Sequence, residues 1–357
     1  MIFSSLFDLG LIIPLLGLLG ISLSLIASTT SDLLINQLVY FIIGIFLYIF
    51  FAGIDYSIWK KLSKIFYFGS LILLLITFLW SPVRGSHRWI DIGFTRIQPS
   101  EIIKPFMTLV LANIITARKD SYLKSFFITL LIYLPIVLLI FRQPDLGNVI
   151  VYLVAFLAMV FISGLPLIYF ISGGLIFGLL LPIFWSVLKD YQKLRIISFL
   201  NPQNDPSGAG YNALQAIIAI GAGQFLGMGL GKGTQSHLLF LPEYHTDFVF
   251  ASLGEELGFI GGALVIIFCF ILLSRILYSA YKTTDNFGRL ICVGVFAQLF
   301  IQVFINIGMN LGLMPITGIT LPFVSYGGSS ILSSFISLGL VVSINNYSHK
   351  IRPIVIK

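Results

Sequence analysis

The chain has 357 residues, of which 58% are hydrophobic and only 10% are charged. This composition excludes a soluble globular domain and is typical of an integral membrane protein with many helices. The formal net charge of +7 does not indicate nucleic-acid binding, because the basic residues are scattered beside apolar segments instead of following one element. Both cysteines, Cys269 and Cys292, lie in apolar segments, so we expect neither a disulfide nor a structural zinc site.

Apolar runs of about twenty residues predict an all-α polytopic membrane protein with about ten transmembrane helices. In chain order the predicted spans are 10–28, 36–56, 65–82, 98–117, 125–142, 147–163, 167–188, 252–273, 290–312 and 327–347, in a single domain over residues 1–357. The chain start lacks the basic region of a cleaved signal peptide, so we expect the first span to stay attached. One long loop, 189–246, separates the seventh and eighth spans, and such loops often carry function.

Basic residues in the short loops predict the orientation in the membrane. On one side of the predicted bundle lie Lys60, Lys61, Lys64, Arg118, Lys119, Lys124, Arg275, Lys282, Arg289, Lys350, Arg352 and Lys357. The positive-inside rule makes that side cytoplasmic, which places both termini in the cytoplasm and the 189–246 loop outside. Three basic residues on the opposite side, Arg84, Arg88 and Arg96, make the asymmetry incomplete.

The long loop has two recognisable parts. Residues 212–220 are apolar and predict a short helix at the membrane interface. Residues 221–233 contain six glycines, but Lys232 is followed by glycine instead of Ser or Thr, which excludes a Walker phosphate-binding loop. We interpret the segment as a pliable loop whose backbone approaches a bulky ligand.

Four charged residues fall where a lipid-exposed helix should have none. Glu101 and Lys104 lie on one face at the start of the fourth span, and Arg142 and Asp145 lie between the fifth and sixth spans. Two interpretations remain open: a salt bridge, with Asp145 as the preferred partner of Lys104, or a direct role in ligand binding. Both place these side chains inside the bundle.

Ionisable residues also gather in the segment 240–258, at the start of the eighth span: Glu243, His245, Asp247, Glu255 and Glu256. Such a cluster at a membrane boundary is a candidate functional site. If the eighth helix begins near Thr246, Asp247 and Glu255 share a face about 12 Å apart, with Asp247 near the mouth of a cleft and Glu255 deeper. Alternatively, Asp247 caps the helix, or His245 is the functional base.

The approach to the tenth span, 321–330, contains a pair of glycines followed by Ser329 and Ser330. The N-terminus of a helix has unpaired N–H groups and partial positive charge, so it can bind a phosphate. The alternative is close helix packing through Gly327 and Gly328.

Five motifs in this order resemble the SEDS family of RodA, FtsW and SpoVE: GSHRW (85–89), QPSE (98–101), QPDLG (143–147), LPEYHTDFVFASLGEELG (241–258) and SYGGSS (325–330). The resemblance covers nearly the whole chain. Three further segments, FLNP (199–202), GYNALQ (210–215) and GTQSHLLFLPE (233–243), are more similar to RodA, the elongation enzyme, than to FtsW, the division enzyme.

The resemblance implies a peptidoglycan glycosyltransferase that polymerises lipid II, with inversion, at the outer face of the bacterial cytoplasmic membrane during cell elongation. It implies as partners a class B penicillin-binding protein, which is a transpeptidase, together with lipid II, undecaprenyl-diphosphate-linked glycan and membrane lipids. The essential aspartate of the family falls on Asp247, and its other sensitive positions fall on Gln98, Glu101 and Lys104. A lipid-linked precursor flippase or other transporter, and a non-catalytic scaffold of a cell-wall synthase, are the competing functions.

The chemistry of such a reaction assigns roles to these residues. Attack of a sugar hydroxyl on an anomeric carbon needs a base, for which Asp247 is the candidate, and the departing pyrophosphate needs cationic stabilisation. Arg88, Arg96, Arg195 and Lys232 are the candidates for the second role, as is a divalent cation such as Mg²⁺ or Mn²⁺. Around Asp247 we therefore expect a substrate-binding or intramembrane polar network of Arg88, Arg96, Gln98, Glu101, Lys104, Asp145, Lys232, Glu243, His245, Glu255 and Ser329.

Overall fold

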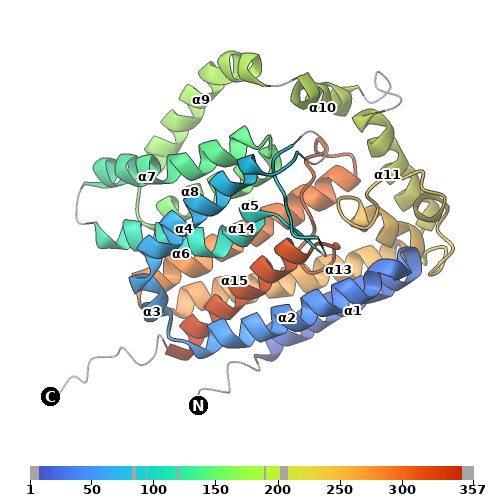
Figure 1. Ribbon diagram of the computed structural model, residues 1–357, viewed down its shortest axis with the longest axis horizontal. Coiled ribbons are helices and arrows are strands. Elements are labelled where there is room, and N and C mark those ends of the chain that lie inside the picture. The colour runs from blue at the N-terminus through green and yellow to red at the C-terminus, as the bar shows by residue number, and fades with distance from the viewer. Residues whose placement is uncertain are drawn as a thin grey trace.

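The structure is a computed structural model that describes residues 8–82, 86–93, 95–118, 121–188, 190–201 and 208–347. Within these ranges the regular secondary structure is helical apart from one two-stranded antiparallel hairpin (Figure 1). Six of the described helices are long and apolar enough to cross a membrane, and several shorter apolar helices accompany them. Both ends of the chain lie outside the described residues. So do two basic residues used in the orientation argument, Arg84 and Lys119.

Each predicted span has a corresponding helix. In order these are α1 (Leu9–Thr29), α2 (Leu34–Gly53), α4 (Ser63–Ile76), α5 and α6 (Pro99–Ile102 and Lys104–Ala117), α7 (Tyr122–Arg142), α8 (Leu146–Ile162), α9 (Leu167–Val187), α13 (Val249–Lys282), α14 (Asn286–Asn310) and α15 (Gly328–Tyr347). The main differences are that the fourth predicted span is broken at Ile103 and that α13 continues beyond its predicted end at 273.

Shorter elements connect these helices. They are η1 (Ser31–Leu33), α3 (Tyr56–Lys61), η2 (Thr77–Leu79), β1 (Ile90–Asp91), β2 (Arg96–Ile97), α10 (Asp190–Leu200), α11 (Ala209–Gly223) and α12 (Thr234–His237). Aspartate side chains accept backbone N–H groups at the starts of α1, α3, α8 and α14, where unpaired donors are most costly in an apolar setting.

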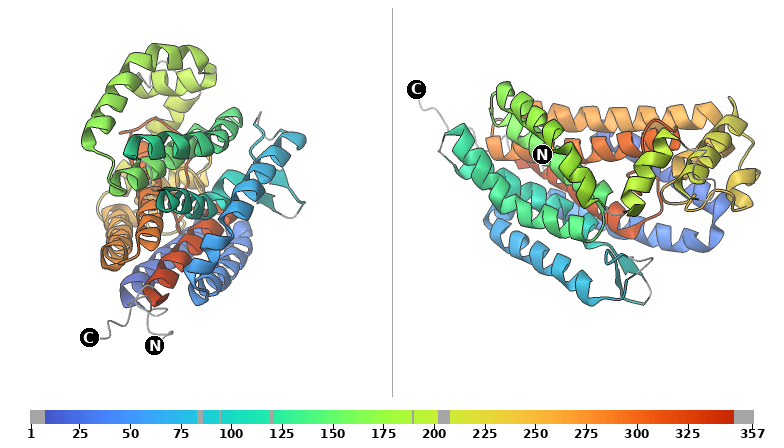
Figure 2. Two further views of the ribbon diagram at one scale, coloured as in Figure 1. Left: turned by 90° about the vertical axis from the view of Figure 1, so that its left-hand side faces the viewer. Right: turned by 90° about the horizontal axis from the view of Figure 1, so that it is seen from above.

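The core of the molecule lies around α15, which is the most enclosed of the long helices. A Cβ atom on Gly339 of α15 would lie 2.8 Å from the Tyr48 carbonyl oxygen of α2, so glycine allows these two helices to touch. In contrast, α9 stands away from the bundle in Figure 1 and in the left view of Figure 2, and nearly all of its described side chains are exposed. A helix that is apolar on every side and exposed in the isolated chain is suited to contact lipid.

The predicted helix at 212–220 is present as α11 and packs on α13. Two of its alanines, Ala216 and Ala219, are completely buried, and a Cβ atom on Gly223 would lie 1.8 Å from the Gly254 carbonyl oxygen. Its position at the membrane interface stays a prediction.

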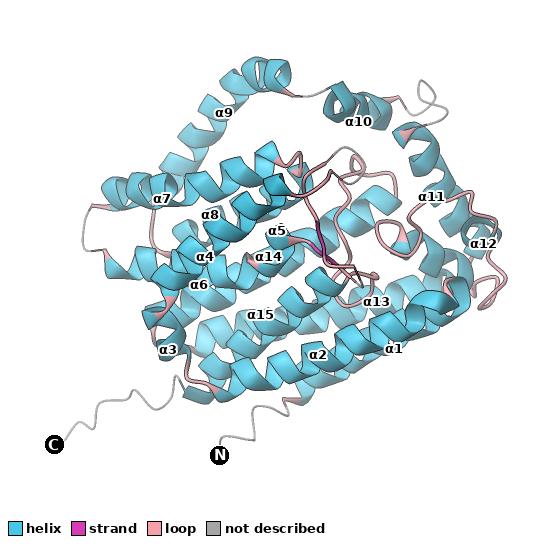
Figure 3. Cartoon of the chain, in the orientation of Figure 1, coloured by secondary structure: helices cyan, strands magenta, loops and turns pink. Residues whose placement is uncertain are grey.

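The glycine-rich segment 221–233 approaches α13, whereas we expected it to approach a ligand. Helix α13 has a non-helical residue, Gly258, at φ 62°, and the N–H of Phe259 donates to the Gln224 carbonyl at 2.9 Å. A Cβ atom on Gly227 would lie 2.2 Å from the Glu256 carbonyl oxygen. Gly223, Gly227 and Gly233 are therefore explained by close contact with the kinked helix, and Gly229 and Gly231 by their positive φ angles, whereas Gly221 has open space beside it. Figure 3 shows the loop part of this segment between α11 and α12.

Candidate functional site

A cavity of about 900 Å³ lies where α2, α5, the hairpin, the turn before α13 and the N-terminus of α15 meet. Eight of the twelve predicted site residues line it: Arg88, Arg96, Gln98, Glu101, Glu243, His245, Asp247 and Ser329. Arg195 of α10 also lines it, so three arginines and three carboxylates share one space. The other four predicted residues, Lys104, Asp145, Lys232 and Glu255, are not on its wall.

Asp247 lies just before α13, which begins at Val249 instead of near Thr246. The N-cap residue is Phe248, and the side chain that satisfies the Ala251 N–H in the first turn belongs to Asn310, at 3.0 Å. Asp247 is therefore not the helix cap. Its carboxylate lies close to Gly318, where a Cβ atom would be 3.3 Å from Asp247 Oδ2.

His245 belongs to an aromatic part of the cavity wall. Its ring makes edge contacts with Tyr244 and Tyr326, with centroids 5.1 and 5.8 Å apart, and Tyr40 packs on the far side of Tyr326 at 6.1 Å. Burial and the neighbouring Tyr40 raise the pKa of Tyr326 to about 12, so its hydroxyl stays protonated at neutral pH. Tyr326 is then a hydrogen-bond donor and not a base.

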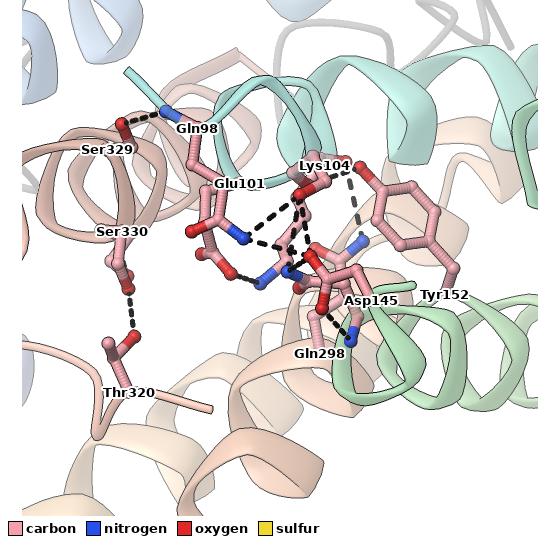
Figure 4. Close-up of polar contacts among 12 residues, drawn as sticks. Gln98, Glu101, Lys104, Asp145, Tyr152, Gln298, Thr320, Ser329 and Ser330 are labelled. Carbon is pink, nitrogen blue, oxygen red and sulfur yellow. Dashed lines mark hydrogen bonds and ion pairs between the residues drawn. The ribbon is translucent and has the colours of Figure 1, made fainter. Parts of the chain in front are cut away.

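Lys104 pairs with Glu101, and not with Asp145 as we predicted. Lys104 Nζ is 2.7 Å from Glu101 Oε1, and the two residues are only 2% and 5% exposed (Figure 4). The helix break at Ile103 and the three-residue spacing bring the two charges together locally. Asp145 accepts hydrogen bonds from neutral donors and lies 4.0 Å from the Arg88 guanidinium, which explains why it does not need the lysine.

Asp145 is the centre of a separate network of neutral donors behind the cavity wall. Its Oδ2 accepts from Gln98 Nε2 at 2.9 Å, from Ser100 Oγ at 3.1 Å and from Asn148 Nδ2 at 2.9 Å (Figure 4). Tyr152 OH donates to the Ser100 carbonyl at 2.8 Å. This network joins the QPSE and QPDLG motifs and presents Gln98 to the cavity.

Arg88 connects the hairpin region to the same turn. Its Nε donates to the Gln143 carbonyl at 3.0 Å, it also donates to the Pro144 carbonyl, and its guanidinium is 4.0 Å from Asp145. By contrast, Arg142 is exposed at the end of α7, so the prediction that it lies inside the bundle is wrong. A long basic side chain at a helix end can extend to the aqueous boundary, which removes the need for a buried partner.

The start of α15 forms another part of the wall. Ser329 Oγ accepts the Gln98 N–H at 2.9 Å, and Thr320 Oγ1 donates to Ser330 Oγ at 2.8 Å (Figure 4). A Cβ atom on Gly328 would lie 2.7 Å from the Tyr40 ring, so the close packing predicted for the glycine pair is present at this position. The N-terminus of α15 also faces the cavity, which leaves a phosphate-binding role as a prediction.

Glu255 lies outside the cavity, so its predicted place deeper in the same cleft is wrong. It is completely buried and accepts from Gln235 N–H at 2.8 Å and from Ser236 Oγ at 3.0 Å. The next residue, Glu256, accepts from Ser28 Oγ at 2.8 Å and lies 2.9 Å from His237 Nε2. The two carboxylates hold the 231–237 loop on α13.

Lys232 is exposed on that loop and contributes no group to the cavity wall. The cationic groups that do line the cavity are therefore Arg88, Arg96 and Arg195. Arg96 forms a salt bridge with Asp91 on the exposed hairpin, with 3.1 Å between Arg96 Nε and Asp91 Oδ2.

Two residues that the sequence argument missed hold the turn before α13. Asn306 and Asn310 of α14 are completely buried, and both donate to the Asp247 carbonyl. The signal was available, because two amides one helical turn apart inside an apolar span are expensive unless they have a specific partner.

The fold and the cavity define a polytopic helical membrane protein with a large charged site. Residues 1–350 match the FtsW/RodA/SpoVE family of cell cycle proteins. The chain therefore belongs to this family, and the resemblance seen in the motifs is confirmed.

Curated relatives come from several branches of the family. The stage V sporulation protein E of Bacillus subtilis (strain 168) is 37% identical over 319 residues, which cover 88% of this chain and 87% of that protein. The probable peptidoglycan glycosyltransferase FtsW of Trichlorobacter lovleyi is 34% identical over 356 residues, covering 95% and 93%. The peptidoglycan glycosyltransferase MrdB of Escherichia coli (strain K12) is 36% identical over 308 residues, covering 85% and 83%. The names of the last two agree with the predicted enzyme class, and the preference for RodA stays a prediction.

Solved structures share the fold over almost the whole chain. A chain from the structure described as "Structural coordination of polymerization and crosslinking by a peptidoglycan synthase complex" has a TM-score of 0.85 and 30% identity, with 96% of this chain and 98% of that chain covered. The rod shape determining protein RodA of Thermus thermophilus has a TM-score of 0.73 and 27% identity, with 96% and 97% covered.

Proposed function

We propose that this chain is a peptidoglycan glycosyltransferase that polymerises lipid II at the outer face of the cytoplasmic membrane, in the RodA-like role of cell elongation. The observation that carries the proposal is the position of Asp247 on the wall of a cavity of about 900 Å³ that three arginines also line. A cavity of this size and charge suits a large ligand with a pyrophosphate group. The relatives named as peptidoglycan glycosyltransferases support the same activity.

In the proposed reaction, Asp247 takes the proton from the attacking sugar hydroxyl. The hydroxyl oxygen forms a bond to the anomeric carbon while the bond from that carbon to the pyrophosphate oxygen breaks, which inverts the configuration. Arg88, Arg96 and Arg195 stabilise the negative charge of the leaving pyrophosphate. Because a pyrophosphate leaves without protonation, the reaction needs one base and no paired general acid.

A divalent cation, Mg²⁺ or Mn²⁺, is part of the same proposal. The cavity wall carries the carboxylates of Glu243 and Asp247, which are the oxygen donors these ions prefer. Among the described residues no three His, Cys, Asp or Glu side chains are grouped as a metal site. The protein would thus supply one or two ligands and the pyrophosphate oxygens and water the others, as is common for Mg²⁺.

The decisive assay uses the purified chain in detergent with labelled lipid II. We expect a ladder of glycan chains, because polymerisation does not need a membrane to cross. A flippase or a non-catalytic scaffold gives no ladder under these conditions. A parallel reaction with a chelator, followed by restoration with Mg²⁺ or Mn²⁺, tests the cation separately.

We also propose that the helices form about ten spans with both termini in the cytoplasm, and that a class B penicillin-binding protein is the partner. The likeness to a chain of a peptidoglycan synthase complex supports such a partner. Co-purification of the full-length chain with the transpeptidase encoded by the same organism tests this association.

The two ends of α2 provide a direct test of the orientation. Ser31 and Ser57 lie just beyond its opposite ends, and both are exposed. In a background in which Cys269 and Cys292 are replaced by Ser, we expect a membrane-impermeant thiol reagent to label Ser31→Cys but not Ser57→Cys in intact cells or spheroplasts. Labelling of Ser57→Cys alone reverses the topology, and permeabilised cells serve as the control for reactivity at both positions.

A further inference from the structure

Two asparagines of α14 share one acceptor beside the cavity. Asn306 Nδ2 donates to the Asp247 carbonyl at 3.0 Å, and Asn310 Nδ2 donates to the same oxygen at 3.1 Å. Both asparagines are completely buried. A backbone carbonyl has two lone pairs, so this oxygen is fully satisfied by two side chains from one helix face.

The same two side chains also hold the surroundings of Asp247. Asn306 Nδ2 donates to the Ile319 carbonyl at 2.7 Å, and the preceding residue, Gly318, packs against the Asp247 carboxylate. Asn310 Oδ1 accepts the N–H of Ala251 in the first turn of α13 at 3.0 Å. The asparagines thus connect the Asp247 turn, the start of α13 and the segment that contacts the carboxylate.

The backbone carbonyls of the two residues before Asp247 also accept hydrogen bonds. His245 O accepts the N–H of Tyr326 at 2.8 Å, and Thr246 O accepts Ser325 Oγ at 2.7 Å. Three consecutive carbonyls in a segment without regular secondary structure are therefore all paired with groups from α14 or from the SYGG motif. This pairing fixes the direction of the turn, and with it the direction of the Asp247 side chain.

We propose that Asn306 and Asn310 are positioning residues for Asp247, which keep its carboxylate beside Gly318 on the cavity wall. The inference rests on the proposed function, in which Asp247 is the base. A general base works only within hydrogen-bond reach of the proton it accepts, and a displacement of about 1 Å costs up to about a hundredfold in rate. Loss of either amide removes one of the two donors that hold the Asp247 carbonyl, without altering the carboxylate itself.

The test compares Asn306→Ala and Asn310→Ala with the unmodified chain, using purified full-length protein and lipid II. We expect kcat to fall about tenfold or more, which corresponds to about 1.4 kcal/mol, with KM changed less than about twofold. In the Asp247→Asn background, whose remaining rate needs no positioned base, we expect the same substitutions to cause less than about a twofold further loss. Asn306→Ser retains one donor and should recover part of kcat.

Asn346→Ala is the matched control, because Asn346 Nδ2 also donates to a backbone carbonyl, that of Ala52, at 3.2 Å, on a different pair of helices. Asn346 is only half-buried, so its loss should lower the midpoint of thermal unfolding less than the loss of Asn306, and it should leave kcat unchanged. The proposal is overturned if Asn306→Ala keeps its kcat, or if the loss is the same in both backgrounds. If Asn306→Ala does not fold, Asn310→Ser decides by the same criteria. Should Asp247→Asn itself keep full activity, the base assignment fails, and not the positioning alone.

Discussion

Asp247→Asn is expected to reduce the rate of lipid II polymerisation by about a hundredfold or more without disrupting the fold. Asparagine keeps the shape of the side chain but cannot accept the proton from the attacking hydroxyl. The backbone carbonyl of Asp247, which Asn306 and Asn310 hold, is untouched by the substitution. The initial rate of glycan-chain formation with labelled lipid II measures the effect.

If Asp247 had only a structural role, Asp247→Asn would leave the rate nearly unchanged. Asp247 does not cap α13, because Asn310 accepts the Ala251 N–H in its first turn, so the substitution removes no cap and should not lower the stability. If the variant folds and polymerises lipid II at nearly the original rate, the base assignment is wrong. His245→Gln is then the next variant to measure, because His245 lines the same cavity. Glu255→Gln is a useful contrast, since Glu255 lies outside the cavity and should affect stability more than the rate.

Hydropathy predicted the helices of this chain well because the bilayer imposes their length. A segment such as Asn286–Asn310 must be long and apolar whatever it packs against, so its position is visible in the sequence alone. Two of the details that failed, the kink at Gly258 and the start of α13, depend on contacts between segments far apart in the chain. The break at Ile103 has a local cause, because Pro105 at the start of α6 has no N–H with which to continue the preceding turn.

The candidate site was predicted in part for a related reason. Motif residues such as Asp247, Gln98 and Ser329 could be assigned to one site from the sequence, because a family resemblance carries information about long-range contacts. All three line the cavity. Helical spacing alone placed Glu255 on the wrong surface, since the 231–237 loop, which periodicity does not describe, covers it. Neutral amides such as Asn306 carry no charge, and a search for ionisable groups overlooks them.

The sequence also did not predict the correct partner of Lys104. This pairing leads to a second prediction with a large expected effect, on stability. Lys104→Met is expected to destabilise the protein severely, because it leaves the buried Glu101 carboxylate without its cation. Removing one partner of a buried pair typically costs about 3–5 kcal/mol. Among the described residues, the second oxygen, Glu101 Oε2, has no hydrogen-bond partner that would offset the loss. The midpoint of thermal unfolding in detergent, read from tryptophan fluorescence, should fall accordingly.

Glu101→Gln provides the second arm of a double-mutant cycle. With the carboxylate neutralised, Lys104→Met should recover much of its lost stability, since no unpaired charge remains in the bundle. The comparison cycle of Lys104→Met with Asp145→Asn should show a clearly smaller coupling, because Asp145 is satisfied by Gln98, Ser100 and Asn148. A larger coupling with Asp145 than with Glu101 contradicts the pairing described here.

Glu101 also lines the cavity, so polymerisation by the protein with both Lys104→Met and Glu101→Gln separates the two roles of this pair. Full activity makes the pair purely structural, whereas a folded but inactive protein assigns Glu101 to the substrate site.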